Sequence, residues 1–185
     1  YYVGGLPKNP KPPFNYKAPF SPVDVIEEYI RPARMKVNGK RITRSALSEI
    51  ENINFENVGT LEAFNTDGLR SILVTMDHIN NMKEKTLRYP GHAALMANYR
   101  NAGKFDKERI RKTSDELFRA WRLEKNEPEL TIMKIIIKIE RSKIEYNLYD
   151  EFDVKTGFSS MSRTTGFTAT ATVNMVALNL FNECG

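Results

Sequence analysis

An alternating pattern in residues 130–153, LTIMKIIIKIERSKIEYNLYDEFD, constrains the fold more than any other stretch. Every second position from Thr131 to Ile139 belongs to one apolar face, and the positions between them are mixed, so the segment is predicted to be a β-strand. Ser142 and Lys143 are expected to turn the chain back into a second strand. An apolar sheet face must be covered, either by the domain's own helices or by a second subunit.

Helix signals occur at four places before these strands. Ser21 followed by Pro22 predicts a helix start, and Pro32 predicts its end. The apolar spacing predicts two further helices, at residues 92–100 and 107–123. Thr66 or Asp67 is expected to cap another helix, with apolar positions at Leu69, Ile72, Leu73 and Met76.

Extended and irregular segments complete the pattern. Asn38-Gly39 predicts a two-residue turn between two strands, and residues 82–89 alternate as a strand does. Residues 1–20 hold five prolines, so we expect a loop that lies over a surface. The order of helices and strands predicts an α+β fold: a mixed β-sheet with helices packed on one face.

The segment 159–183, SSMSRTTGFTATATVNMVALNLFNE, begins with small side chains and ends with apolar ones. Thr164 or Thr165 is expected to cap a helix whose first N–H groups face an anion. The alternative is a helix that packs tightly against a neighbouring domain. The two interpretations are compatible.

Composition excludes several classes of protein. A chain of 185 residues with 41% hydrophobic and 28% charged residues is typical of one globular domain, and we expect no metal site. The net charge of +5 is interleaved with acidic residues, which argues against nucleic-acid binding. Apolar runs are too short for a membrane span, and the N-terminus lacks the order of a secretory signal. The one cysteine, Cys184, fits a reducing cytoplasm, and its place at the chain end argues against a nucleophile.

Five stretches together resemble the second domain of the saccharopine dehydrogenase family: YYVGGLP, YKAPFSPVDVIEEY, GTLEAFNTDGLRSIL, MKEKTLRYPGH and GFSSMSRTTGFTATATVNMVA. That family includes glutamate-forming saccharopine reductases, lysine 6-dehydrogenases and carboxynorspermidine dehydrogenases. The resemblance covers nearly the whole chain. Its most specific pieces are AFNTDGL, TLRYPGH and RTTGF.

The resemblance implies a two-domain oxidoreductase that acts on CH–NH donors. In such an enzyme a Rossmann domain of the same chain binds NAD or NADP, and residues 1–185 supply a domain for substrate binding and homodimer contacts. We expect this chain to be excised from that longer protein. It lacks the G-x-G-x-x-G fingerprint, and the lone pair Gly4-Gly5 is the only weak candidate for a cofactor contact. The fragment alone is therefore expected to hold no cofactor and to have no turnover, with the catalytic groups mainly in the absent domain.

The implied substrate is an amino acid or its imine adduct, and the charged joint at 82–92 is its expected site. Arg88 is a candidate carboxylate clamp, because a guanidinium binds carboxylates with two parallel hydrogen bonds. Lys85 adds a positive charge, Tyr89 adds a hydroxyl donor, and His92 is the group expected to titrate near physiological pH. The other candidates lie in the same motifs or at the same cleft or hinge: Asn65, Thr66, Asp67, Gly91, Arg163, Thr164 and Thr165.

Each candidate also has a simpler explanation. Arg88 can pair with Glu84 along the strand, and Lys85, which points to the other face, can be a solvated lysine. Tyr89 and His92 can be packing residues, and Asn65 and Asp67 can be helix caps.

Three functions therefore stay open. The first is the substrate-binding and dimerisation domain of a glutamate-forming saccharopine dehydrogenase in lysine metabolism. The second is the equivalent domain of a lysine 6-dehydrogenase or carboxynorspermidine dehydrogenase. The third is a non-catalytic module that binds an amino acid or dimerises.

Overall fold

The computed structural model describes residues 1–183, so Cys184 lies outside the described residues. The elements follow in the order β1 (Tyr2–Pro7), α1 (Pro22–Ile30), β2 (Ala33–Val37), β3 (Lys40–Arg44), β4 (Glu51–Phe55), β5 (Gly59–Asn65), α2 (Ile72–Thr75), β6 (Lys85–Arg88), α3 (His92–Asn101), α4 (Ile110–Trp121), β7 (Glu129–Ile139), β8 (Ser142–Glu151), α5 (Ser160–Ser162), the π-helical segment η1 (Arg163–Phe167) and α6 (Thr168–Ala177). No helix in the described part of the chain is long and apolar enough to cross a bilayer.

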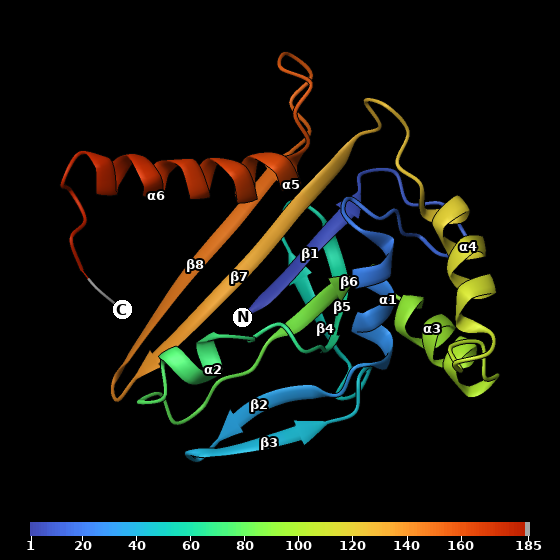
Figure 1. The fold of residues 1–185 in the computed structure, drawn as a ribbon, viewed down its shortest axis with the longest axis horizontal. Coiled ribbons are helices and arrows are strands. Elements are labelled where there is room, and N and C mark those ends of the chain that lie inside the picture. Colours follow the sequence, from blue (N-terminus) through green and yellow to red (C-terminus); the bar gives the residue numbers. More distant parts are fainter. Residues whose placement is uncertain (184–185) are drawn as a thin grey trace.

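Six strands form one mixed sheet in the order β4-β5-β6-β1-β7-β8, and β2 pairs with β3 in a separate hairpin (Figure 1). The β1 and β6 strands are parallel, while the other neighbouring pairs are antiparallel. The α+β fold with a mixed sheet is confirmed. So are the hairpin at Asn38-Gly39 and the helices α1, α3 and α4.

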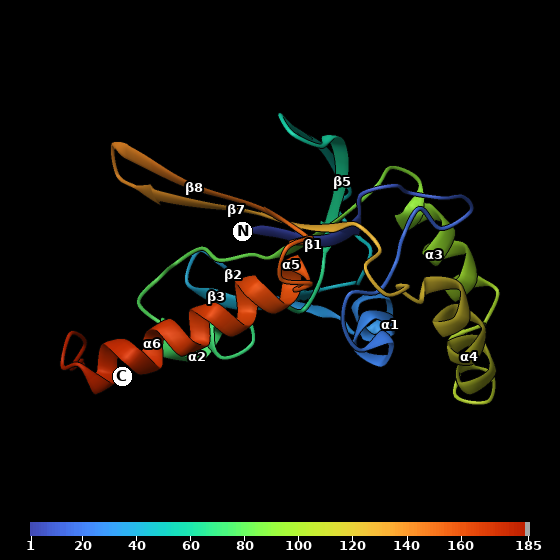
Figure 2. The same ribbon diagram turned by 90° about the horizontal axis from the view of Figure 1, so that it is seen from above.

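The sheet has one face covered by helices and one face that curls onto itself. Figure 2 shows the helices on one side of the sheet, while β5 rises on the other. Inside the curl, side chains of five strands pack together without a helix. They are Leu6, Phe55, Leu61, Ala63, Leu87, Leu130 and Ile132. On the helix-covered face, Phe64 of β5 packs with α1, α3 and α4, through residues such as Tyr29, Met96 and Trp121.

The expectation of a loop at residues 1–20 is wrong for residues 2–7. Tyr2–Pro7 is the strand β1, which lies between β6 and β7 in the interior of the sheet. The prolines begin only at Pro7, so the preceding residues keep the N–H groups that a ladder requires. Composition averaged over twenty residues concealed this strand.

Two local predictions also need correction. The helix expected from Thr66 or Asp67 is only the short α2, because β5 continues to Asn65 and the chain then crosses toward β2. Thr66 and Asp67 therefore cap no helix. The turn expected at Ser142 and Lys143 lies at residues 140–141, and β8 already begins at Ser142.

The far end of the β7–β8 hairpin and all of α6 are exposed. β1 pairs with β7 only as far as Lys134, so the hairpin continues past it without a neighbour on that side. Figure 2 shows α6 extending away from the sheet, and its side chains are exposed. The apolar pattern predicted for 130–139 is thus buried at its start and uncovered at its end.

Candidate functional site

A cleft of about 340 Å³ lies on the helix-covered face, between α1 and the strands β1 and β6. We call it the β1–α1 cleft. Its walls carry both signs of charge. The carboxylates are Asp24, Glu27, Glu28, Asp67 and Glu84, and the guanidinium groups are Arg31 and Arg70. Thr66 and Asp67 are the two predicted site residues that line it.

Glu84 is the most enclosed carboxylate of the cleft, with only 3% of its surface exposed. Its oxygens accept hydrogen bonds from the Thr66 hydroxyl, from the Gly68 N–H at 3.1 Å and from the Thr86 hydroxyl at 3.4 Å. Burial raises the pKa of Glu84 in spite of these donors. The cleft therefore contains a carboxyl group that keeps its proton to a higher pH than a surface one does.

Asp67, unlike Glu84, is already paired with a cation, the Arg34 guanidinium. Arg34 of β2 donates three hydrogen bonds to its carboxylate, from the backbone N–H at 3.1 Å, Nε at 2.9 Å and Nη2 at 2.7 Å. Burial favours the neutral acid, but the Arg34 hydrogen bonds outweigh it and hold the pKa of Asp67 below its usual value. Asp67 thus ties the β2–β3 hairpin to the edge of the cleft.

Arg88 lies behind the cleft wall, and only 2% of its surface is exposed. Its Nη2 is 2.6 Å from Glu28 Oε2, its Nη1 donates to the Leu87 carbonyl at 2.9 Å, and its guanidinium lies 4.3 Å from the centre of the Tyr16 ring. The pairing of Arg88 with Glu84 considered from the sequence is therefore wrong. Burial raises the pKa of Glu28 to about 7, although the Arg88 charge opposes this.

Three predicted site residues point to the other face of the sheet. Strand alternation places Lys85 and Asn65 opposite one another inside the curl. Lys85 pairs there with Glu51 at 2.8 Å, and the Asn65 amide donates to Ser48 at 3.0 Å. The Tyr89 hydroxyl donates to the Pro7 carbonyl at 2.9 Å. The sheet itself separates these side chains from Thr66 and Asp67.

The joint at Gly91 and His92 is held by Glu62. Gly91 has a φ of 95°, which glycine adopts without strain, and α3 begins directly after it. The Glu62 carboxylate accepts the N–H groups of Gly91 at 3.0 Å and Ala93 at 2.5 Å. It therefore caps α3 from a neighbouring strand.

His92 is buried among aromatic rings and is not a titrating group near pH 7. Its Nδ1 lies 2.8 Å from the Phe14 carbonyl and its Nε2 lies 2.9 Å from the Tyr29 hydroxyl. Burial, with a smaller contribution from the Arg88 charge, lowers the pKa of His92 to about 3. The expectation of a titrating histidine at this joint is thus wrong, because the ring packs in the core.

The RTTGF stretch forms η1, and its cap differs from the prediction. The helical segment begins at Ser160, where the Ser159 side chain accepts the Ser162 N–H at 3.1 Å. Thr164 and Thr165 therefore lie one turn inside, and the Thr164 hydroxyl donates to the Ser160 carbonyl at 2.9 Å. Arg163 lies near Asp150 and Asp153, at 3.3 and 3.5 Å. None of the three lines the β1–α1 cleft.

Gly4 and Gly5 have a packing explanation. A Cβ on Gly4 would lie 2.8 Å from the Leu87 carbonyl oxygen, and one on Gly5 would lie 2.7 Å from Pro19 and 2.8 Å from Met161. The pair lies in the middle of a strand and not in a turn before a helix, so it does not fit a dinucleotide pyrophosphate. In residues 1–183 no three metal-ligating side chains converge.

Sequence reasoning missed Glu28, Glu62 and Glu84. For Glu84 a signal existed, because strand alternation places it on the same face as Thr86 and Arg88. Glu28 and Glu62 gave none. Their roles depend on Arg88 and on the start of α3, which approach them only in the folded chain.

Comparison with known proteins extends over the whole chain. The profile of the family described as Saccharopine dehydrogenase C-terminal domain matches residues 1–185. Among solved structures, the apo, histidine-tagged saccharopine dehydrogenase (L-Glu forming) from Saccharomyces cerevisiae matches 98% of this chain with a TM-score of 0.73. At 16% identity this likeness shows a shared fold, and the match covers 59% of the yeast chain.

Proposed function

This chain belongs to the saccharopine dehydrogenase C-terminal domain family, and we propose that it is the substrate-binding and dimerisation domain of a longer NAD(P)-dependent oxidoreductase. The proposed reaction of the intact protein is that of the glutamate-forming saccharopine dehydrogenases, at a C–N bond in lysine metabolism. A Rossmann domain of the same chain would hold the nucleotide. A cytoplasmic location is part of the proposal, supported by the single cysteine.

The mixed charge of the β1–α1 cleft carries this proposal. Amino acids and their adducts have both amine and carboxylate groups, and the cleft offers carboxylates for the first and arginines for the second. Arg70 is the proposed carboxylate ligand, because Arg31 already pairs with Glu27 at 2.9 Å. Glu84 and the Thr66 hydroxyl are proposed to bind the amine, because Glu84 lies at the floor of the cleft with its charge unpaired by any arginine or lysine of residues 1–183.

The domain's contribution to the reaction is orientation. The bound nicotinamide would supply the hydride chemistry. Because the substrate would be held at both charged ends, its reacting carbon would face the nicotinamide bound by the Rossmann domain. Arg88, proposed from the sequence as a carboxylate clamp, already binds Glu28, so we propose that it holds Glu28 in the cleft wall.

Activity of the intact protein tests the proposal. Absorbance at 340 nm would follow NADH or NADPH oxidation with α-aminoadipate semialdehyde plus glutamate, and reduction of either cofactor with saccharopine or lysine. Turnover with saccharopine is the expected result. Turnover with lysine alone would assign a lysine 6-dehydrogenase, and no turnover with either substrate would contradict the proposal and favour a binding module.

Variants of the cleft test the site separately. Arg70→Ala is expected to raise KM about tenfold or more, because a charge-assisted hydrogen bond to a carboxylate is lost. Arg109→Ala is the matched control, since Arg109 is an exposed arginine outside the cleft. Equal KM values for both variants would remove Arg70 from the substrate site.

The exposed end of the β7–β8 hairpin is the proposed dimer contact. Ile135, Ile137 and Ile139 alternate onto one face of β7, and Ile144 and Tyr146 of β8 lie on the same face because they pair with Ile137 and Ile135. Ile137, Ile139, Ile144 and Tyr146 are 40%, 55%, 39% and 57% exposed. We expect a dimeric mass by light scattering at tens of micromolar. Ile137→Lys should give a monomer, whereas Lys138→Glu on the opposite face should not.

The second uncovered surface, on α6 and the residues just after it, is the proposed contact with the Rossmann domain. Val173, Val176 and Leu180 are more than half exposed, although they are apolar. An uncovered apolar helix of this kind is typical of a surface that another unit of the protein covers.

A further inference from the structure

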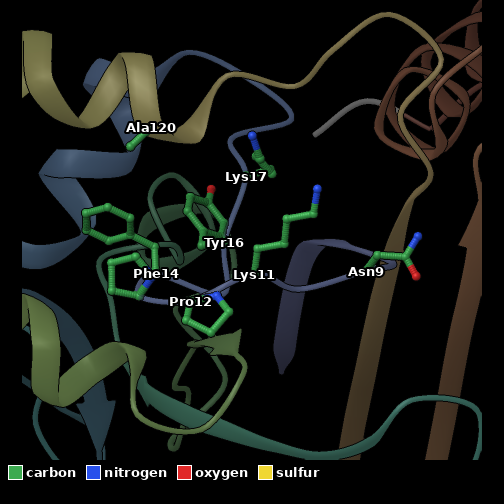
Figure 3. A pocket seen from close by; sticks show the side chains of 8 residues that line it. Asn9, Lys11, Pro12, Phe14, Tyr16, Lys17 and Ala120 are labelled. Atoms are coloured by element: carbon green, nitrogen blue, oxygen red, sulfur yellow. The ribbon is translucent and has the colours of Figure 1, made fainter.

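A second cavity, of about 250 Å³, lies between the proline-rich loop of residues 9–17 and the end of α4. We call it the loop pocket. It shares no lining residue with the β1–α1 cleft, so it is a separate site. Figure 3 shows Lys11, Lys17 and Tyr16 around it, with the two amino groups and the hydroxyl directed to the same side of the loop.

The loop pocket carries charge of one sign, whereas the β1–α1 cleft carries both. Lys11 and Lys17 line it, and no acidic side chain does. Among residues 1–183, no carboxylate lies within ion-pair distance of either lysine. Lys17 donates one hydrogen bond, to the Arg122 carbonyl at 2.8 Å, and an ammonium has three to give. Positive charge with spare donors is therefore gathered in one concave place.

The Tyr16 hydroxyl supplies an independent indication of a ligand. Tyr16 is 3% exposed, and its hydroxyl has no hydrogen-bond partner within the described chain. The indole N–H of Trp121, whose ring meets that of Tyr16 edge to face at 5.3 Å, also lacks one there. Buried donors without partners are rare in native proteins, and each calls for an explanation. Burial also raises the pKa of Tyr16, so the hydroxyl keeps its proton.

We propose that the loop pocket binds a small anion through a carboxylate or phosphate group, which Lys11 and Lys17 neutralise and to which the Tyr16 hydroxyl donates. The remaining wall includes Pro12, Pro13 and Phe14, which would pack against a short carbon skeleton. Pocket volume restricts the ligand to a small metabolite or an inorganic ion. This inference stands apart from the function proposed above and does not require it.

The single tryptophan of the chain gives a direct readout, because Trp121 packs against Tyr16. Its fluorescence would be followed while inorganic phosphate, acetate or glutarate is added at constant ionic strength, with chloride as the reference salt. We expect a saturable change with phosphate or with the carboxylates at concentrations up to tens of millimolar. Which of them saturates identifies the anionic group. A response that is the same for all salts, chloride included, would overturn the proposal.

Variants decide whether the signal comes from the loop pocket. Lys11→Gln combined with Lys17→Gln is expected to weaken binding about tenfold or more, since two charge-assisted contacts are lost. Lys107→Gln combined with Lys112→Gln is the matched control, because both lysines are exposed and outside the pocket. Tyr16→Phe keeps the ring against Arg88 and should weaken binding several-fold. Unchanged affinity in the Lys11/Lys17 variant would refute the assignment.

Discussion

Acid is expected to destabilise this fold through His92, whose buried ring has one defined tautomer. The Phe14 carbonyl can only accept a hydrogen bond, so Nδ1 carries the proton and Nε2 accepts from the Tyr29 hydroxyl. A second proton would remove that acceptor and place a positive charge in the core beside Arg88. Burial and this charge together lower the pKa of His92 from 6.5 to about 3.

The magnitude follows from linkage. Between pH 6.5 and 3 the unfolded chain binds a proton at this position that the folded chain refuses, so the contribution is present above pH 6.5 and is lost as the pH falls. Each pH unit below 6.5 costs about 1.4 kcal/mol, and the change from pH 7.5 to 5.0 therefore costs about 2 kcal/mol. Glu28 acts in the opposite sense. Its pKa is raised to about 7, so its contribution to stability grows as the pH falls toward 4.5.

Because these two groups oppose each other, the test compares His92→Phe with the unchanged protein. The free energy of unfolding would be measured by urea titration with circular dichroism at pH 7.5 and pH 5.0. The variant should be less stable at both pH values, since Phe14 and Tyr29 lose their partner. The difference in free energy of unfolding between the unchanged protein and the variant should be about 2 kcal/mol smaller at pH 5.0 than at pH 7.5. A disadvantage that does not change with pH would refute the buried, neutral ring.

Two further substitutions test the packing around the site. Gly5→Ala should lower the free energy of unfolding in urea by about 1 to 3 kcal/mol, because its Cβ would lie within 2.8 Å of Pro19 and Met161. Gly166→Ala is the control and should cost under about 0.5 kcal/mol, because the space around Gly166 is open. Equal effects of the two substitutions would contradict the close approach at β1. Glu62→Gln should cost about 1 to 2 kcal/mol, because an amide has one acceptor oxygen where the carboxylate accepts the N–H groups of both Gly91 and Ala93. Glu56→Gln, in an exposed turn, is the control, and hydrogen exchange should show faster opening of α3 only in the Glu62 variant.

The elements that could be predicted from the sequence are those with local signals. The β7–β8 hairpin, the β2–β3 hairpin and α1 each have their alternation, turn or cap within a dozen residues. The strands β4 and β5 form a local hairpin, and they were missed because β4 has only two apolar residues, Ile53 and Phe55, to indicate an alternating pattern. The strand β1 was missed because its partners are distant. Tyr2, for example, pairs with Lys85 and Lys134. The stability of a strand comes from those neighbours, which a local window does not contain.

For the candidate site, too, the sequence predicted what depends on local geometry and not what depends on distant elements. Strand alternation indicated that Lys85 and Arg88 point to opposite faces of β6, as the structure shows. Which face is a cleft and which is filled depends on α1 and on the curl of β4 and β5. The same holds for the charge state of His92, because its pKa is set by Tyr29, Phe14 and Arg88.

By itself, the sequence determined the local elements, the α+β class and, through its motifs, the family. Tertiary structure alone decided that Arg88 binds Glu28, sixty residues away, and that Tyr16 is left with an unpaired hydroxyl at the loop pocket. The physical reason is that helix and strand signals depend on short-range backbone sterics, whereas burial and electrostatics depend on every group that comes close in space. A charged side chain in the sequence therefore identifies a possible chemistry, and only its folded surroundings assign the role.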